Sequence, residues 1–124
     1  MGLPGHATPE GTHRFRQRFA AKVAEGHFRR FHGLWLSSVG LGTYLGDEDA
    51  GTDELYRDAV VRAVELGCNV LDSAIDYRHQ RSERAMGTAL DSCPIQPAPT
   101  NKIHGARRWD RCRYSWTFTK VSSA

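Results

Sequence analysis

The spacing of apolar side chains near the start of the chain predicts an amphipathic helix from Thr12 to Gly26. Phe15, Phe19 and Val23 recur four residues apart, which places them on one side of a helix. Thr12 is suited to cap its first turn, and Gly26 to end it in a left-handed conformation. The outer face is basic, so this helix either binds a partner or, as we favour, packs its two phenylalanines on the rest of the domain.

Two short apolar runs then predict a β-hairpin. They span His27–Phe31 and Leu34–Val39, and the break between them, His32-Gly33, contains a glycine, as tight turns often do. The next segment, Val39–Thr43, is apolar and punctuated by glycine. This pattern predicts a buried strand that ends where another stretch of backbone comes close to it.

The clearest pattern in the sequence predicts a helix followed by a strand. Thr52 is a suitable N-cap, and two acidic residues follow it in the first turn, where the helix dipole favours negative charge. A broad apolar face at helical spacing is formed by Leu55, Ala59, Val60, Ala63, Val64 and Leu66. Gly67 ends this helix, and Cys68–Leu71 predicts a short buried strand that ends at Asp72. A strand, a helix and a second strand in succession favour an α/β fold with a parallel sheet.

Beyond this unit the sequence predicts one more helix and then little regular structure. Ser82 is suited to cap a helix over Glu83–Leu90. Three prolines between residues 94 and 99 exclude regular helix there, and only Tyr114–Val121 alternates enough to predict a strand. We therefore divide the chain into an N-terminal extension with a helix (1–26), an α/β portion (27–90) and a basic tail (91–124).

Length and composition indicate a protein of one domain without a membrane span or a metal site. At 124 residues the chain is long enough for one domain. It has no apolar run of the ~20 residues that a membrane span requires, and no continuous apolar segment typical of a secretory signal. Its three widely spaced cysteines predict free thiols in a reducing compartment, so we expect a cytoplasmic protein. The histidine and cysteine spacings do not predict a metal site.

Charge is distributed unevenly, with basic ends around an acidic middle. The tail alternates four arginines with three aromatic residues: Arg107, Arg108, Trp109, Arg111, Arg113, Tyr114 and Trp116. Such a mixture can stack on nucleic-acid bases. A solvated segment is the commoner origin of such a composition, so we do not expect a nucleic-acid partner.

Candidate chemistry lies at the ends of the predicted strands, where parallel α/β folds bind their ligands. Asp72 ends an apolar strand, where a carboxylate requires a partner. Tyr77 is a candidate proton donor, and a phenol needs a nearby cation to act at neutral pH. Lys120 is the lysine at the end of a predicted strand. Arg78 and His79 either face the pocket or, as we favour, lie in a solvated loop.

Several of these segments, in this order, resemble the aldo-keto reductase family: Val39–Tyr44, Ala63–Ala74, Tyr77 and Ser82–Leu90. The resemblance extends from about Leu34 to Leu90, near half of the chain. Because several motifs occur together in the family's order, the resemblance is more specific than any one of them.

This resemblance implies a (β/α)₈ barrel that binds NADP(H) and reduces carbonyl compounds by hydride transfer. By its motifs, Tyr77 matches the proton donor, and Asp72 and Lys120 match the residues that tune it. The same motifs assign Gly42, Thr43 and Asp72 to the cofactor and Tyr44 to the substrate. A complete barrel takes ~250 residues and eight strands, so we expect a partial TIM barrel with the N-terminal hairpin and the first βα units.

Two functions follow from the sequence. The first is NADPH-dependent reduction of a small carbonyl compound by an incomplete chain of aldo-keto reductase type. The alternative is a non-catalytic barrel remnant, because a partial sheet leaves an unpaired edge that favours self-association or a partner protein. Neither function involves a membrane.

Overall fold

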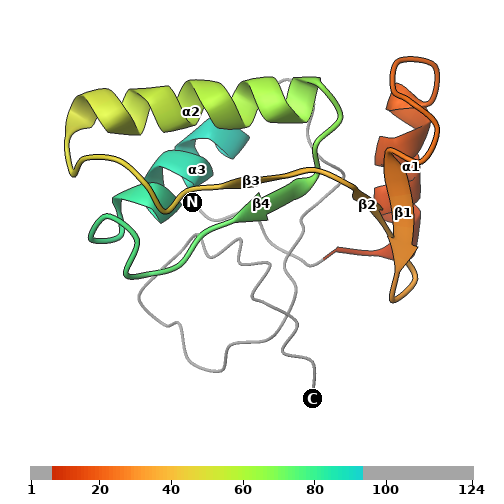
Figure 1. Cartoon of the computed structure of the whole chain (residues 1–124), viewed down its shortest axis with the longest axis horizontal. Helices are drawn as coiled ribbons and strands as arrows, with labels where there is room; N and C mark the ends of the chain where they lie inside the picture. The colour runs from red at the N-terminus through yellow and green to blue at the C-terminus, as the bar shows by residue number, and fades with distance from the viewer. Residues whose placement is uncertain (1–6, 94–124) are drawn as a thin grey trace.

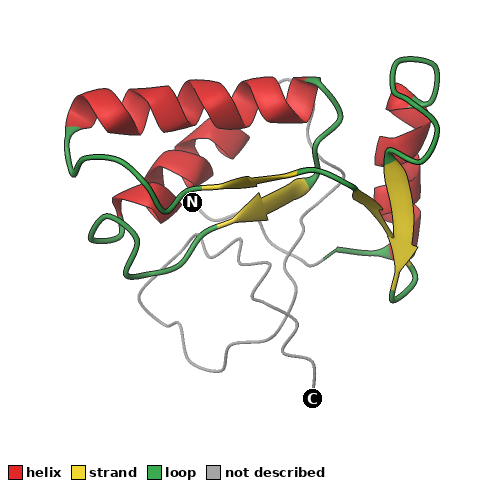
Figure 2. Cartoon of the chain, viewed as in Figure 1, coloured by secondary structure: helices red, strands yellow, loops and turns green. Residues whose placement is uncertain are grey.

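The computed structural model describes residues 7–93, which form a mixed α/β arrangement of three helices and two small sheets. In chain order its elements are α1 (Pro9–Phe19), β1 (Phe28–Phe31), β2 (Leu34–Ser37), β3 (Gly40–Gly42), α2 (Ala50–Glu65), β4 (Val70–Asp72) and α3 (Arg81–Ser92). Helices α2 and α3 lie on one side of the β3–β4 sheet, and α1 packs beside the β1–β2 hairpin (Figures 1 and 2).

Helix α1 lies earlier in the chain than its apolar spacing predicts. Its N-cap is Thr8, whose hydroxyl accepts from the backbone N–H of Gly11 at 3.0 Å. The assignment of Thr12 as the cap was therefore wrong. The Thr12 hydroxyl instead donates to the Thr8 carbonyl at 3.0 Å and accepts from the backbone N–H of Trp35, also at 3.0 Å. The helix ends at Phe19, before Gly26, and the predicted packing of Phe19 in the core is confirmed.

The predicted hairpin is confirmed. Strands β1 and β2 pair antiparallel, and Phe31 opposite Leu34 is the last pair before the turn. His32 and Gly33 both have positive φ, 47° and 81°, as a two-residue type I′ turn requires. The second strand ends at Ser37, two residues earlier than its apolar run predicts.

The hairpin is joined to the β3–β4 region through Asn69. The side-chain oxygen of Asn69 accepts from the backbone N–H of Ser37 at 2.8 Å, and the Ser37 hydroxyl accepts from the Asn69 N–H at 3.1 Å. The Asn69 side chain also donates to the Trp35 carbonyl at 2.9 Å. Because these groups are buried or partly buried, the bonds fix the second strand of the hairpin against the start of β4.

Strands β3 and β4 are parallel, with helix α2 connecting them, as the sequence predicts. The expected burial of the first of these strands was wrong, because Gly40 and Gly42 are exposed. Gly40 lies opposite Val70, and Gly42 lies opposite Asp72. A side chain at Gly40 would come within 2.9 Å of the Val70 side chain, so glycine allows the two strands to approach here. This strand–helix–strand unit is the α/β element that positions the candidate site.

Helix α2 begins before the predicted cap. The side chain of Asp49 accepts from the backbone N–H of Thr52 at 2.7 Å, so Asp49 is the N-cap and Thr52 lies inside the helix. The predicted broad apolar face was also wrong. Only Val60 and Val64 are buried in this helix, whereas Leu55 is 70% exposed.

The predicted end of helix α2 is confirmed. Gly67 follows the helix with a φ of +93°, and its N–H donates to the Val64 carbonyl at 3.0 Å. A side chain here would lie 3.2 Å from the Phe19 ring. Glycine is thus required both by the backbone conformation and by the packing of α1.

Helix α3 is not capped by Ser82, contrary to the sequence prediction. Its N-cap is Gln80, in a left-handed conformation and without a side-chain hydrogen bond to the helix. The Ser82 hydroxyl donates instead to the Thr43 carbonyl at 2.6 Å. A residue suited to cap the helix is used here to join it to the end of β3.

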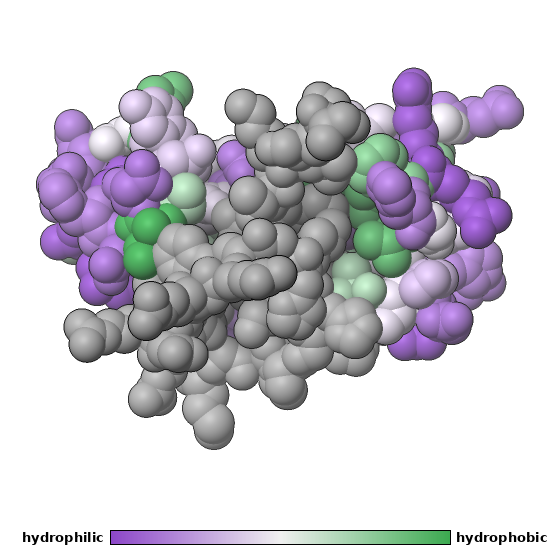
Figure 3. Space-filling model, turned by 90° about the horizontal axis from the view of Figure 1, so that it is seen from below, coloured by the Kyte–Doolittle hydropathy of each residue, from purple (hydrophilic) through white to green (hydrophobic). Residues whose placement is uncertain are grey.

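One apolar cluster links these elements. Its buried members are Phe15, Phe19, Phe28, Val60, Val64, Leu71, Met86, Ala89, Leu90 and Cys93. Cys68 is also buried, and its thiol donates to the Val39 carbonyl at 3.3 Å. No helix within residues 7–93 combines the length and apolar character of a membrane span. Figure 3 shows hydrophilic residues over both ends of the face opposite α2.

Candidate functional site

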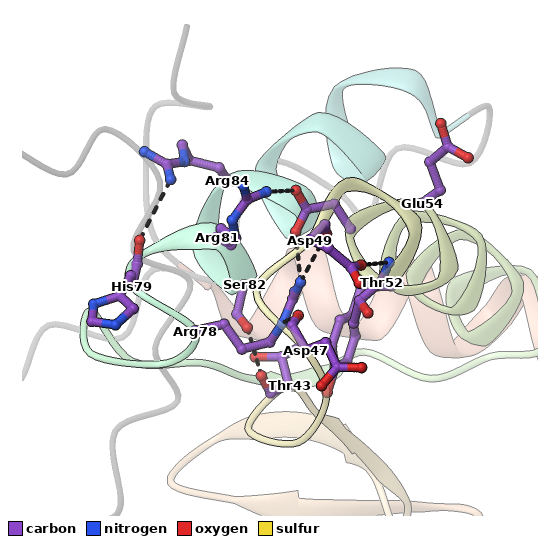
Figure 4. A network of polar contacts seen from close by, with 12 residues as sticks. Thr43, Asp47, Asp49, Thr52, Glu54, Arg78, His79, Arg81, Ser82 and Arg84 are labelled. Atoms are coloured by element: carbon purple, nitrogen blue, oxygen red, sulfur yellow. Dashed lines mark hydrogen bonds and ion pairs between the residues drawn. The ribbon is translucent and has the colours of Figure 1, made fainter.

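The ends of the two parallel strands bring together residues that are about thirty positions apart in the sequence. Thr43 follows β3, is 0% exposed, and donates its hydroxyl to the Asp72 carbonyl at 2.9 Å. Its own carbonyl accepts from Ser82 at the start of α3 (Figure 4). These two bonds hold the carboxyl ends of β3 and β4 and the start of α3 together.

Gly42 and Asp72 lie opposite each other at this edge. The preceding residues of both strands, Leu41 and Leu71, pack in the core beneath the helices. Because successive side chains of a strand point to opposite faces, Gly42 and Asp72 lie on the face turned away from the helices. Asp72 is exposed, and a side chain added at Gly42 would meet no atom of the other described residues within 4 Å. Within residues 7–93, open space therefore adjoins an exposed carboxylate.

The two tyrosines predicted from the sequence are in contact. The ring centroids of Tyr44 and Tyr77 are 5.0 Å apart, with an interplanar angle of 71°. This edge-to-face geometry is one that aromatic pairs prefer. Tyr44 is 66% exposed and Tyr77 is partly buried, so the pair lines the strand ends with an aromatic surface.

The surroundings of Tyr77 favour its protonated form. Burial is the largest cause that raises the pKa of the Tyr77 phenol, and the negative charges of Asp72 and Asp76 raise it further. A phenol in this environment keeps its proton at neutral pH, and it is a weaker acid than an exposed tyrosine. The cation expected to offset these effects, Lys120, lies outside the described residues.

Next to Tyr77 the structure contains a set of ionic contacts that we call the arginine clamp: Arg78, Asp53 and Arg81. The Arg78 side chain is 2% exposed, and its Nη2 lies 2.7 Å from Asp53 Oδ1. Its Nε donates to the backbone carbonyl of Asp47 at 2.7 Å (Figure 4). The prediction of a solvated loop was therefore wrong for Arg78. It is confirmed for His79, whose side chain is exposed.

Asp53 uses both carboxylate oxygens in the arginine clamp, because Arg81 Nη1 lies 2.5 Å from Oδ2. Burial alone would raise the pKa of Asp53. Hydrogen bonds from Arg78 and Arg81 outweigh this effect, so the pKa is lower than its ordinary value. The carboxylate stays ionised, and each of its oxygens accepts from one guanidinium.

Sequence reasoning missed the arginine clamp because its residues are brought together by the fold. The dipole at the start of α2 is enough to account for an acidic residue at position 53. Asp53 is also 25 positions away from Arg78 in the sequence, so no local pattern connects the two. The loop conformation has no sequence signal either, since Arg78, His79 and Gln80 all have positive φ without being glycine. Asp53 in a first helical turn and an arginine after Tyr77 are individually ordinary.

Comparison with known proteins leaves the function open. No family model matches the chain. No solved structure gives a significant match either. The motifs and the geometry of the strand ends are therefore the features of this chain that point to a function.

Proposed function

We propose that this chain is the N-terminal portion of an NADPH-dependent oxidoreductase of aldo-keto reductase type, folded as part of a (β/α)₈ barrel. The observation that carries this proposal is the register of the parallel pair, in which Gly42 lies opposite Asp72. This register gathers the residues of the family-like motifs at one edge of the sheet. Helices cover one face of that sheet, as they cover the outside of a barrel.

The residues at the strand ends are compatible with the proposed cofactor. The space that the described residues leave open at Gly42 would accept a flat ring against the backbone, and the exposed Asp72 carboxylate can accept hydrogen bonds from that ring. Thr43 is buried with its hydroxyl donated to β4, so it supports the site by holding the strands. NADPH, when bound, supplies the hydride that adds to the carbonyl carbon.

In this proposal Tyr77 donates its phenolic proton to the carbonyl oxygen, which becomes the alcohol hydroxyl. Overall, the carbonyl compound, NADPH and one proton give the alcohol and NADP⁺. Tyr44 packs against Tyr77 and offers an exposed aromatic surface to the substrate. Because burial and acidic neighbours raise the pKa of Tyr77, proton donation needs a cation nearby, a role that the resemblance gives to Lys120.

One observation favours the alternative of a non-catalytic remnant. The described sheet that carries the site has two strands of three residues each, whereas a closed barrel has eight strands. Within residues 7–93 the outer edges of β3 and β4 have no strand partner. Such edges bind other strands readily, so self-association or a partner protein is the competing function.

The test is carbonyl reduction by the purified full chain, followed through the loss of NADPH absorbance with a panel of aldehydes and ketones. We expect turnover in the wild type and none in Tyr77→Phe, with cofactor binding retained in the variant. Unchanged turnover in Tyr77→Phe would contradict the catalytic role of Tyr77. An inactive wild type whose molar mass rises with concentration in light scattering would favour the alternative.

A further inference from the structure

The loop after Tyr77 adopts a conformation that ordinary residues avoid. Arg78, His79 and Gln80 have φ values of 50°, 51° and 68°, which is a turn of left-handed helix built without glycine. Left-handed residues with a side chain are strained, and they persist where surrounding contacts hold them. His79 and Gln80 are exposed, and the contacts of His79 with Glu48 and Arg84 lie at the surface, so the buried Arg78 is the residue best placed to hold this turn.

Within residues 7–93, the hydrogen bonds of the Arg78 guanidinium go to one segment, residues 47–53. Its Nε donates to the Asp47 carbonyl at 2.7 Å. Its Nη2 donates to Asp53 Oδ1 at 2.7 Å and approaches the Asp49 carbonyl at 3.4 Å. This segment begins three positions after Tyr44, and Arg78 directly follows Tyr77. The guanidinium thus joins the two loops that carry the aromatic pair.

A second contact strengthens the same connection. The Arg78 guanidinium lies 5.1 Å from the ring centroid of Tyr56, within the range of a cation–π interaction. The Tyr56 hydroxyl in turn donates to the carbonyl of Leu45, the neighbour of Tyr44. Arg78 therefore stabilises the loop of Tyr44 through direct bonds to its far end and through Tyr56 near Tyr44 itself.

From these contacts we propose that Arg78 is a positioning residue, which binds segment 47–53 and thereby sets the ring of Tyr77 against Tyr44 at the strand ends. Its effect on catalysis rests on the proposed function, whereas its effect on the geometry does not. A structural need for the turn alone would be met better by glycine, which adopts positive φ without strain. The planar guanidinium, with several donors aimed at separate acceptors, supplies what glycine lacks.

Two matched glycine substitutions distinguish the positioning role of the Arg78 guanidinium from a purely structural need for the left-handed turn. Arg78→Gly and Gln80→Gly each place glycine at a left-handed position, and only the first removes the guanidinium. The readout is the nuclear Overhauser effect between the ring protons of Tyr44 and Tyr77 in tyrosine-labelled full-length chain. We expect the effect to be lost in Arg78→Gly and retained in Gln80→Gly. The titration midpoint of the Tyr77 phenol should also fall towards its ordinary value in Arg78→Gly, because the freed ring is less buried.

A folded Arg78→Gly chain that keeps the Tyr44–Tyr77 effect would overturn the proposal. If amide dispersion shows that this variant does not fold, Arg78→Lys replaces it, because lysine keeps the positive charge but has a single ammonium group that cannot bind the three acceptors of segment 47–53 together. A weakened ring contact in Arg78→Lys supports the positioning role, and an unchanged one overturns it.

The consequence for catalysis is measured separately. In an active chain we expect kcat to fall about 100-fold in Arg78→Gly with a smaller change in KM, as for a misplaced proton donor. Gln80→Gly should leave kcat unchanged. If the ring contact is lost in Arg78→Gly while the wild type reduces no carbonyl compound, Arg78 is still a positioning residue and the proposed function fails.

Discussion

Replacing Asp53 with asparagine tests how much the arginine clamp contributes to stability. The substitution keeps the shape of the side chain and removes its charge, while Arg78 stays buried. A buried hydrogen bond to a charged group contributes about 1.5–3 kcal/mol, and the half-exposed Arg81 pair adds about 0.2–1 kcal/mol. The asparagine oxygen still accepts one hydrogen bond, so we expect a loss of about 2–3 kcal/mol in the free energy of unfolding.

Urea unfolding of the full chain measures this loss, and the neighbouring Glu54→Gln provides the control. Glu54 lies 4.0 Å from Arg57, and its side chain is 75% exposed. A surface pair of this kind contributes little, so Glu54→Gln should change the free energy by less than about 0.5 kcal/mol. Equal midpoints and slopes for the two variants would refute the reasoning, because the buried and the exposed carboxylate would then contribute alike.

Three further predictions concern acid stability and packing. The pKa of Asp53 is lowered from 3.8, so its contribution is present above that value and is lost as the pH falls through the lower folded pKa. The stability difference between wild type and Asp53→Asn, measured by urea unfolding at successive pH values, should therefore shrink on acidification; a constant difference would contradict the assignment. Gly67→Ala should cost about 1–2 kcal/mol for its positive φ, plus the clash with Phe19. Gly26→Ala, where a side chain would meet none of the other described residues within 4 Å, should cost less in the same assay, and equal costs would exclude the clash. Ser73→Ala should leave the unfolding free energy unchanged or raise it by up to about 1 kcal/mol, because the buried Ser73 hydroxyl has no hydrogen-bond partner among residues 7–93; a clear loss would show that this hydroxyl has one.

The elements that the sequence predicts well are those defined by local physics. The hairpin follows from two apolar runs around His32-Gly33, whose positive φ values suit the turn. The strand–helix–strand unit follows from the apolar run that ends at Asp72 and from Gly67. In each case neighbouring residues carry enough information to select one backbone conformation.

Helix starts were predicted less well because several residues near each start are suited to cap it. Thr8 and Thr12 are both suited to be the N-cap of α1. Thr8 caps the helix, whereas the Thr12 hydroxyl accepts a hydrogen bond from Trp35 of the hairpin. Ser82 likewise does not cap α3, because its hydroxyl donates to the Thr43 carbonyl. Tertiary hydrogen bonds decided these cases, and they are not visible in local sequence.

The residues of the candidate site were also predicted only in part from the sequence. The motifs identify Tyr44, Asp72 and Tyr77, and the parallel register brings their positions to one edge. The arginine clamp depends on burial of Arg78 against a segment 25 or more positions away. Charged residues are seldom buried in proteins, so the sequence around Arg78 favours a solvated loop.

Titration of the purified chain with NADPH, followed by quenching of tryptophan fluorescence, tests the central claim most directly. Gly42→Val would fill the space that the described residues leave open beside Asp72, whereas Gly51→Ala, at an exposed position of α2, is the control. We predict saturable binding by the wild type and by Gly51→Ala, and binding at least about tenfold weaker in Gly42→Val. Absence of binding by the wild type, or equal binding by all three chains, would contradict a cofactor site at the ends of β3 and β4.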